Sequence, residues 1–150
     1  MSADLEGPDR RAALTRDIID RTGIDEVAIE AFVRAFYAAA RVDPLLGPKF
    51  DDVADWEAHV ARIACFWRSV ALMTGDYHGQ PMQAHAHLRL EPAHFARWLS
   101  LFEEVARARF THQGAEHMLD RARRIARSLE MGLIPLVLPP KGAAVAGRAS

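Results

Sequence analysis

The chain has 150 residues, and 50% of them are hydrophobic, which is enough for one domain with a single core. Its formal net charge of −1 argues against a nucleic-acid-binding protein, because such proteins present a basic surface to phosphates. No apolar stretch reaches the roughly 20 residues needed to span a bilayer, so no membrane partner is expected. The charged N-terminus does not resemble a signal peptide, and the single cysteine, Cys65, cannot form an internal disulfide. These features predict a reducing, cytoplasmic location.

Apolar residues recur at helical spacing along most of the chain and no strand pattern is found, so the sequence predicts an all-α fold. Residues 1–22 carry a weak apolar stripe and are expected to form an N-terminal arm or accessory helix. One helical domain is expected over 23–134, followed by a flexible tail at 135–150 that is rich in proline, glycine and small residues. The expected helices of the domain span about 25–42, 56–73, 92–110 and 114–133, with a short one near 82–88.

Several local signals place the ends of these helices. Thr22, three residues before Asp25, resembles the start of a capping box for the first helix of the domain. Asp55 is expected to cap the next helix, and Pro92 suits the first turn of a later one. The segment LLGPKF at 45–50 is too apolar for a surface loop, so we expect it to fold over the core.

Histidines are concentrated beside apolar sequence. On the helix at 56–73, His59 heads an apolar stripe at helical spacing that continues through Ile63, Phe66, Trp67 and Val70. A Gly-Pro loop leads to His85 and His87, and His94, which we expect to be exposed, follows Pro92. A neutral imidazole is a good iron ligand when its second nitrogen is held by a hydrogen bond. We therefore interpret one of these histidines as an axial ligand of a flat, buried cofactor, haem.

Other interpretations of the histidines remain open at this point. A zinc site needs three or four clustered ligands, and a di-iron bundle needs paired Glu-x-x-His motifs that project inward. Glu91 and His94 have that spacing, but no second copy exists on a matching helix. The HExxH, CxxC, P-loop and GxGxxG motifs are absent from the sequence, so metalloprotease and nucleotide-binding functions have no support. A helical interaction module with incidental histidines is the remaining alternative.

A series of ordered motifs carries a resemblance to a known family: FY at 36–37, LLGPKF at 45–50, DWEAH…FW at 55–67, GDYHGQPMQAH at 75–85 and HFARWLSLF at 94–102. With them, about residues 25–134 of the chain resemble the truncated haemoglobins of group III. These are short bacterial globins built as a globin-like two-over-two helical sandwich. The group lacks the paired-glycine motifs of the other two groups, and this chain lacks them too. The longer N-terminal segment and the proline-rich C-terminal tail depart from the family pattern.

The resemblance implies roles for eight residues of a haem site, and three nearby cations are additional candidates from the sequence. His85 would coordinate the iron of haem b (iron protoporphyrin IX) as the proximal ligand, with His87 as the rival. The residues implied on the distal, ligand-binding side are Tyr37, His59 and Trp98. Further contacts to the cofactor are implied for Phe50, which would pack against the porphyrin, and for Ile63, Phe66 and Trp67. Candidates for pairing with the haem propionates are Lys49, Arg62 and Arg89.

These roles indicate a haem protein that binds dioxygen or another diatomic gas, nitric oxide or carbon monoxide. Dioxygen gains partial negative charge on ferrous haem, and Tyr37 and Trp98 would supply two hydrogen-bond donors that stabilise this charge in an apolar pocket. The alternative is a haem enzyme, either a nitric oxide dioxygenase or peroxidase-like. Such an enzyme would need a separate reductase, because the chain has no flavin or nicotinamide motif.

Overall fold

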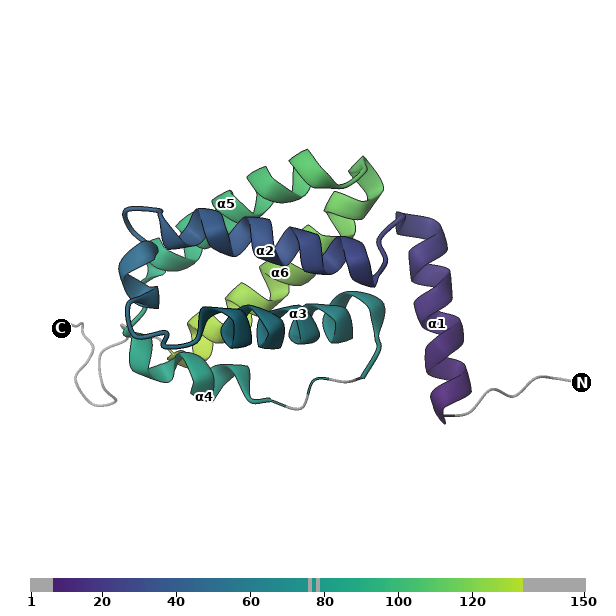
Figure 1. The fold of residues 1–150 in the computed structure, drawn as a ribbon, viewed down its shortest axis with the longest axis horizontal. Coiled ribbons are helices and arrows are strands. Elements are labelled where there is room, and N and C mark those ends of the chain that lie inside the picture. Colours follow the sequence, from purple (N-terminus) through teal and green to yellow (C-terminus); the bar gives the residue numbers. More distant parts are fainter. Residues whose placement is uncertain (1–6, 76, 78, 134–150) are drawn as a thin grey trace, which may run out of the picture.

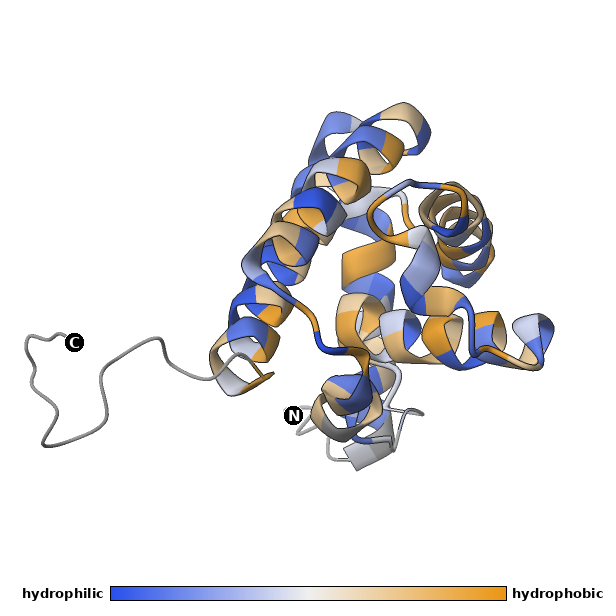
Figure 2. Cartoon of the chain, turned by 90° about the vertical axis from the view of Figure 1, so that its left-hand side faces the viewer, coloured by the Kyte–Doolittle hydropathy of each residue, from blue (hydrophilic) through white to orange (hydrophobic). Residues whose placement is uncertain are grey.

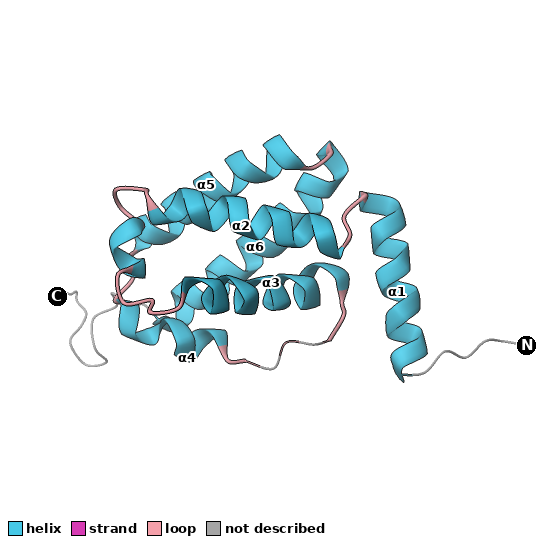
Figure 3. Ribbon diagram, in the orientation of Figure 1, coloured by secondary structure: helices cyan, strands magenta, loops and turns pink. Residues whose placement is uncertain are grey.

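The computed structural model describes residues 7–75, 77 and 79–133, and these form helices joined by short loops, with no strand among them (Figure 3). The all-α prediction is therefore confirmed. No helix in this part of the chain is long and apolar enough to cross a membrane. The elements are, in order, α1 (Gly7–Thr22), α2 (Glu26–Arg41), the 3-10 helix η1 (Gly47–Phe50), α3 (Trp56–Leu72), α4 (Pro81–His85), the 3-10 helix η2 (Ala86–Leu88), α5 (Pro92–Arg109) and α6 (His112–Leu133).

Two layers of paired helices make up the body of the protein. Helix α2 packs against α3 and α5, and α6 packs against α5, α3 and the short α4 (Figure 1). This is the predicted two-over-two sandwich. Helix α1 is the extra N-terminal element and packs across the ends of α3 and α6, with Ile18 buried in the core. The predicted tail at 135–150 lies outside the described residues. The predicted domain boundaries, at 22/23 and 134/135, remain predictions.

Two helix starts lie where the sequence predicted them. The carboxylate of Asp55 accepts the backbone N–H of Ala58 at 3.1 Å and caps α3. Pro92 is the first residue of α5, where its missing N–H costs nothing. Both starts depend only on residues within one helical turn, so they can be read from the sequence.

The start of α2 differs from the prediction. Thr22 is the last residue of α1, and its hydroxyl donates to the Ile18 carbonyl at 2.7 Å and accepts from the Ile24 N–H at 3.1 Å. Gly23, with φ +73°, ends α1 there. The residue that caps α2 is Asp25, whose carboxylate accepts a first-turn N–H at 2.8 Å. The prediction of a capping box beginning at Thr22 was therefore wrong, because this threonine ends α1 and does not cap the start of α2.

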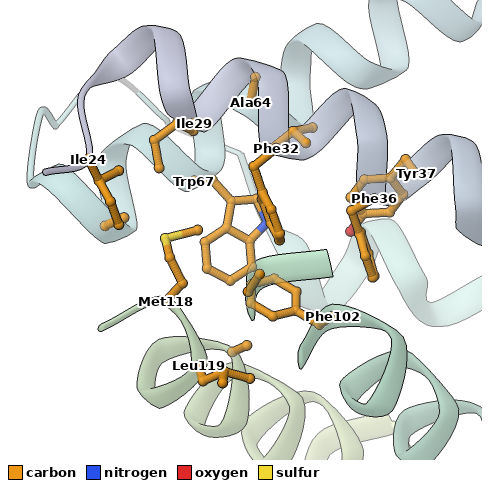
Figure 4. Packing of buried hydrophobic residues seen from close by; sticks show 14 of the residues in the cluster. Ile24, Ile29, Phe32, Phe36, Tyr37, Ala64, Trp67, Phe102, Met118 and Leu119 are labelled. Carbon is orange, nitrogen blue, oxygen red and sulfur yellow. The ribbon is translucent and has the colours of Figure 1, made fainter. Parts of the chain in front are cut away.

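Aromatic side chains from three helices meet at the centre of the core (Figure 4). The ring of Phe102 makes edge contacts with Phe32 and Phe36, with centroid separations of 4.8 and 5.4 Å. The indole of Trp67 lies 5.2 Å from the same ring. Each such contact adds about 0.5–1.5 kcal/mol beyond the burial of its surface. Figure 2 shows hydrophilic and hydrophobic residues following one another along every helix. At helical spacing the hydrophobic residues gather on one side, and this side faces the core.

Helix α3 has two adjacent apolar faces. The face that enters the core consists of Val60, Ala64, Trp67 and Ala71. The predicted stripe consists of His59, Ile63, Phe66, Trp67 and Val70, and apart from Trp67 its members are only partly buried. Successive residues of a helix are about 100° apart, so the stripe lies beside the core face and shares Trp67 with it. Four of the five predicted residues, all but Val70, line the same cavity, which agrees with the prediction that they form one face.

Hydrogen bonds to the side chain of Asp43 fix the position of the segment after α2. The buried carboxylate accepts the backbone N–H groups of Leu45 and Leu46, both at 3.0 Å, and the Nε–H of Arg97 on α5 at 2.7 Å. Leu46 is buried and Phe50 packs against the core, which confirms that this apolar segment folds inward. Leu45 is the exception and is 40% exposed.

Candidate functional site

A largely apolar cavity of about 760 Å³ opens among the helices. Its size falls within the range of about 300–1,000 Å³ that is typical of pockets for cofactors and other small molecules. The structure brings all ten residues assigned from the sequence to its walls: Tyr37, Lys49, Phe50, His59, Arg62, Ile63, Phe66, Trp67, His85 and Trp98. Arg89, the additional candidate for a propionate partner, is not among the lining residues.

His85 ends the short helix α4 and is half-buried in the wall of the cavity. Its Nδ1 lies 2.6 Å from the carbonyl oxygen of Pro81, one turn earlier. Because a carbonyl only accepts hydrogen bonds, Nδ1 carries the proton and donates it to this bond. With the Nδ1 proton held in this way, Nε2 is the ring nitrogen left to bind a metal. A carbonyl partner of this kind is the usual support of a metal-binding histidine.

His87 lies two residues further on, in the 3-10 helix η2, and also lines the cavity. Its side chain is exposed, and no hydrogen bond to its ring is found among the described residues. Those residues also contain no group of three or more His, Cys, Asp or Glu side chains that could hold a metal ion by themselves. The zinc hypothesis therefore gains no support from the geometry.

His59 projects from α3, and its ring packs beside two aromatic neighbours. The ring centroids of Trp56 and Phe50 are 5.6 and 6.0 Å from it. Burial lowers the pKa of His59, and the nearby Arg62 and His85 lower it further, so the ring is neutral at neutral pH. Its Nε2 is buried without a hydrogen-bond partner among the described residues.

An unsatisfied buried nitrogen costs about 1–3 kcal/mol, so the site is incomplete without a group that reaches it. Two histidines, His59 and His85, line the same apolar cavity. The Nε2 of His59 has no hydrogen-bond partner among the described residues, whereas the Nδ1 of His85 is already hydrogen-bonded. The cavity therefore fits a flat, apolar group with an imidazole ligand. Haem is such a group, and these residues would suit it.

Tyr37 on α2 brings a hydroxyl into this apolar region and is only 9% exposed. Burial raises its pKa to about 12, while hydrogen bonding from the side chains of Trp98 and Trp67 acts in the opposite direction. The hydroxyl is thus protonated throughout the physiological range and is available as a donor. The two indole rings are stacked on each other, with centroids 6.5 Å apart and an angle of 20° between their planes.

The segment η1 supplies Phe50 and Lys49. The ring of Phe50 stands nearly perpendicular to that of Tyr37, with centroids 6.0 Å apart. The ammonium of Lys49 donates to the carbonyl of Leu88 at 2.8 Å and to that of Arg89 at 3.4 Å. Lys49 therefore connects η1 to the end of the segment that carries His85. This tertiary contact was not foreseen from the sequence.

His94 is buried, contrary to the expectation that it would be exposed. Its Nδ1 accepts the backbone N–H of Glu91 at 2.9 Å, and the backbone N–H of His94 donates in return to the Glu91 carbonyl at 2.9 Å. This reciprocal cap folds the ring back over the start of α5, where it lines the cavity. The other lining residues that sequence reasoning did not assign to the site include Leu88, Leu90, Phe95, Ile125 and Leu129. Their apolar spacing was visible, but a core stripe has the same spacing.

Comparisons with known proteins agree with this geometry. No protein-family model matches the chain. A curated group 3 truncated haemoglobin of Campylobacter jejuni is 35% identical over 109 residues, which cover 69% of this chain and 86% of that protein. The crystal structure of a group III truncated haemoglobin from Campylobacter jejuni matches with a TM-score of 0.68 at 34% identity, and the match covers 73% of this chain and 91% of that one.

The resemblance noted in the sequence is thereby confirmed, together with the globin fold. Membership of this family implies a haem cofactor and a diatomic gas as ligand. The chain belongs to the group III truncated haemoglobins.

Proposed function

We propose that the protein carries haem b, with His85 as the proximal ligand, and binds dioxygen or another diatomic gas on the opposite, distal side of the cofactor. The observation that carries this proposal is the hydrogen bond of 2.6 Å from His85 Nδ1 to the Pro81 carbonyl in the wall of the cavity. It orients the ring, fixes its tautomer and makes Nε2 a better electron donor. The cofactor, when bound, supplies the iron at which a diatomic ligand coordinates.

The side chains around the cavity would hold the cofactor and exclude water. Phe50, Ile63 and Phe66 present apolar surface to a flat ring. Lys49 and Arg62 are the cations on the lining, and we assign them to the two propionates. An ammonium has three donors, so Lys49 retains hydrogen-bonding capacity beyond its contacts with backbone carbonyls.

The distal side chains would hold a ligand that accumulates negative charge. Tyr37 is the principal donor, because its hydroxyl remains protonated in an apolar site. Trp98 is a second donor, and the neutral ring of His59 a third. Donors that are already in place in a low-dielectric cavity stabilise such charge strongly and slow ligand release. Slow release suits retention of the ligand or chemistry on it better than transport.

The second candidate is a haem enzyme, either a nitric oxide dioxygenase or peroxidase-like. The lowered pKa of His59 favours it, because a neutral imidazole can accept a proton at neutral pH. Turnover would require a separate reductase, since the sequence carries no flavin or nicotinamide motif. A cytoplasmic location, where such a reductase would be found, belongs to the same proposal.

The test is the absorption spectrum of the haem-reconstituted protein in ferric, dithionite-reduced and carbon monoxide-treated forms. We expect a Soret band of one haem per chain that shifts on reduction and again with carbon monoxide. His85→Ala should abolish stable haem retention, whereas the matched control His87→Ala should leave it largely intact. The reverse result would transfer the ligand assignment to His87, and a wild-type protein without a stoichiometric Soret band would refute the haem proposal. Reductant-dependent consumption of nitric oxide or peroxide would distinguish the enzyme from the binding protein.

A further inference from the structure

The segment that carries His85 has little regular structure of its own. His85 ends α4, which has five residues, and the three residues of η2 follow it. Isolated helices of this length are not stable in water, so contacts with the rest of the protein must hold the segment in place. Packing of α4 against α6 is one such contact. At its far end, beyond η2, the segment is held by the side chain of Lys49.

This far end adopts an unfavourable backbone conformation. Arg89 follows η2 with φ +55° and ψ +53°, in the left-handed region that a residue with a Cβ adopts at an energetic cost. Such a conformation persists where the surrounding structure holds it. Here the Nζ of Lys49 donates to the carbonyl of Leu88 at 2.8 Å and to that of Arg89 at 3.4 Å. The ammonium therefore bonds both peptide groups that flank the left-handed residue.

Lys49 has a firm base from which to do this. It lies in η1, whose first residue, Gly47, donates its N–H to the Asp43 carbonyl at 2.7 Å. A Cβ at Gly47 would lie only 2.6 Å from the carbonyl oxygen of Arg41, so η1 packs directly against the backbone at the end of α2. Figure 1 shows the α2–α3 connection at the same end of the molecule as the α4–α5 connection. Lys49 thus ties the end of the His85 segment to a fixed part of the fold.

The next residue of η1 contacts the opposite side of the proposed site. The ring of Phe50 meets the rings of Tyr37 and His59 edge-on, with a centroid separation of 6.0 Å in each case. Adjacent side chains of η1 therefore contact the proposed distal residues and the end of the proposed proximal segment. A shift of η1 would be felt on both sides of the cavity.

We propose that Lys49 is a positioning residue of the proximal side: its ammonium holds the end of segment 81–89, and through it the ring of His85, in place. The proposal rests on the proposed function in that His85 is the iron ligand. Two of the three ammonium donors serve backbone carbonyls, and the third remains for a propionate. Loss of Lys49 should therefore be felt at His85. Loss of Arg62, the other cation assigned to a propionate, should affect only the retention of haem.

The test is hydrogen exchange, measured by NMR on the isotopically labelled, carbon monoxide-bound protein. The Nδ1–H of His85 donates to the Pro81 carbonyl at 2.6 Å, so it exchanges with deuterium when the segment opens. Lys49→Met keeps an apolar stem and removes the donors. It should raise the exchange rates of this proton and of the backbone amides of residues 85–90 about threefold to tenfold, as expected for the loss of one hydrogen bond. Arg62→Met is the matched control, because it removes the same charge from the lining. It should speed the transfer of haem to a competing apoprotein and leave these exchange rates unchanged.

Unchanged exchange of the amides of residues 85–90 in Lys49→Met would overturn the inference, because the ammonium would then not hold the segment. Equal acceleration in Arg62→Met would also overturn it, since the lost charge and not the two hydrogen bonds would be the cause. Failure of the proposed ligand looks different. The ring proton of the ligand histidine is recognised by the large shift that the haem ring current gives it, and its loss in His87→Ala would assign it to His87. That result would refute His85 as the ligand and, with it, the proximal role of Lys49.

Discussion

Replacing Asp43 by asparagine should destabilise the protein measurably, because the carboxylate is both buried and charged. Its side chain is 4% exposed and joins the segment after α2 to Arg97 on α5. Burial alone would raise the pKa of Asp43. Hydrogen bonds from the Leu46 N–H, the Arg97 side chain and the Leu45 N–H, together with the charge of Arg97, outweigh burial and hold the pKa below its usual value.

The magnitude follows from which contacts asparagine retains. Both backbone bonds end on Oδ2, and the side-chain amide of asparagine still offers one oxygen to them. Its NH₂ group then meets the Nε–H of Arg97, so the charge-assisted bond of 2.7 Å is lost. Such a bond contributes about 1.5–3 kcal/mol. Arg97 is 40% exposed and can turn to water, so we expect Asp43→Asn to lower the free energy of unfolding by about 1.5–2 kcal/mol at pH 7.

The assay is urea unfolding of the haem-loaded protein followed by circular dichroism, at fixed haem concentration because bound haem itself adds stability. Since the folded-state pKa of Asp43 is lowered, its stabilisation is present above the unfolded-state value of about 3.9. It is lost as the pH falls through the folded-state pKa. The difference between wild type and Asp43→Asn should therefore be constant above about pH 5 and shrink towards pH 3.

Asp51→Asn is the matched control, because Asp51 lies in the same segment and is exposed. It should have little effect on unfolding at either pH. Equal stability of Asp43→Asn and wild type at pH 7 would refute the reasoning. A difference between them that persists unchanged at pH 3 would refute the assignment of the effect to the carboxylate charge.

Two further predictions address the pocket and the backbone. Tyr37→Phe and Trp98→Phe should each raise the oxygen dissociation rate, measured by rapid mixing, by about tenfold or more, since each removes a hydrogen bond to a partly charged ligand; unchanged rates in both variants would argue against distal donors. Gly47→Ala should destabilise the protein by about 1–3 kcal/mol in urea, because a Cβ there would lie 2.6 Å from the backbone carbonyl oxygen of Arg41. Gly132→Ala is its control and should be nearly neutral, since the new Cβ meets only the end of a flexible methionine side chain; an equal cost at both positions would contradict the steric explanation.

The sequence by itself determined the helices and most of their ends. Apolar spacing predicted the four long helices of the domain, and Asp55 and Pro92 marked two starts correctly, because helix period and capping depend on residues within one turn. The ordered motifs also identified the group of residues that line the cavity. Periodicity alone did not choose between a core stripe and a cofactor pocket, and the family resemblance supplied that choice.

Only the tertiary structure decided how these residues act together. The contact between Asp43 and Arg97 joins positions 54 residues apart, and no local pattern encodes such a pair. Packing of α3 against the other helices turns Val60 and Trp67 into the core and places His59 at the cavity, where its Nε2 has no partner among the described residues. Burial and hydrogen-bond geometry depend on the folded backbone as a whole, so the role of the Pro81 carbonyl behind His85 became visible only in the folded structure.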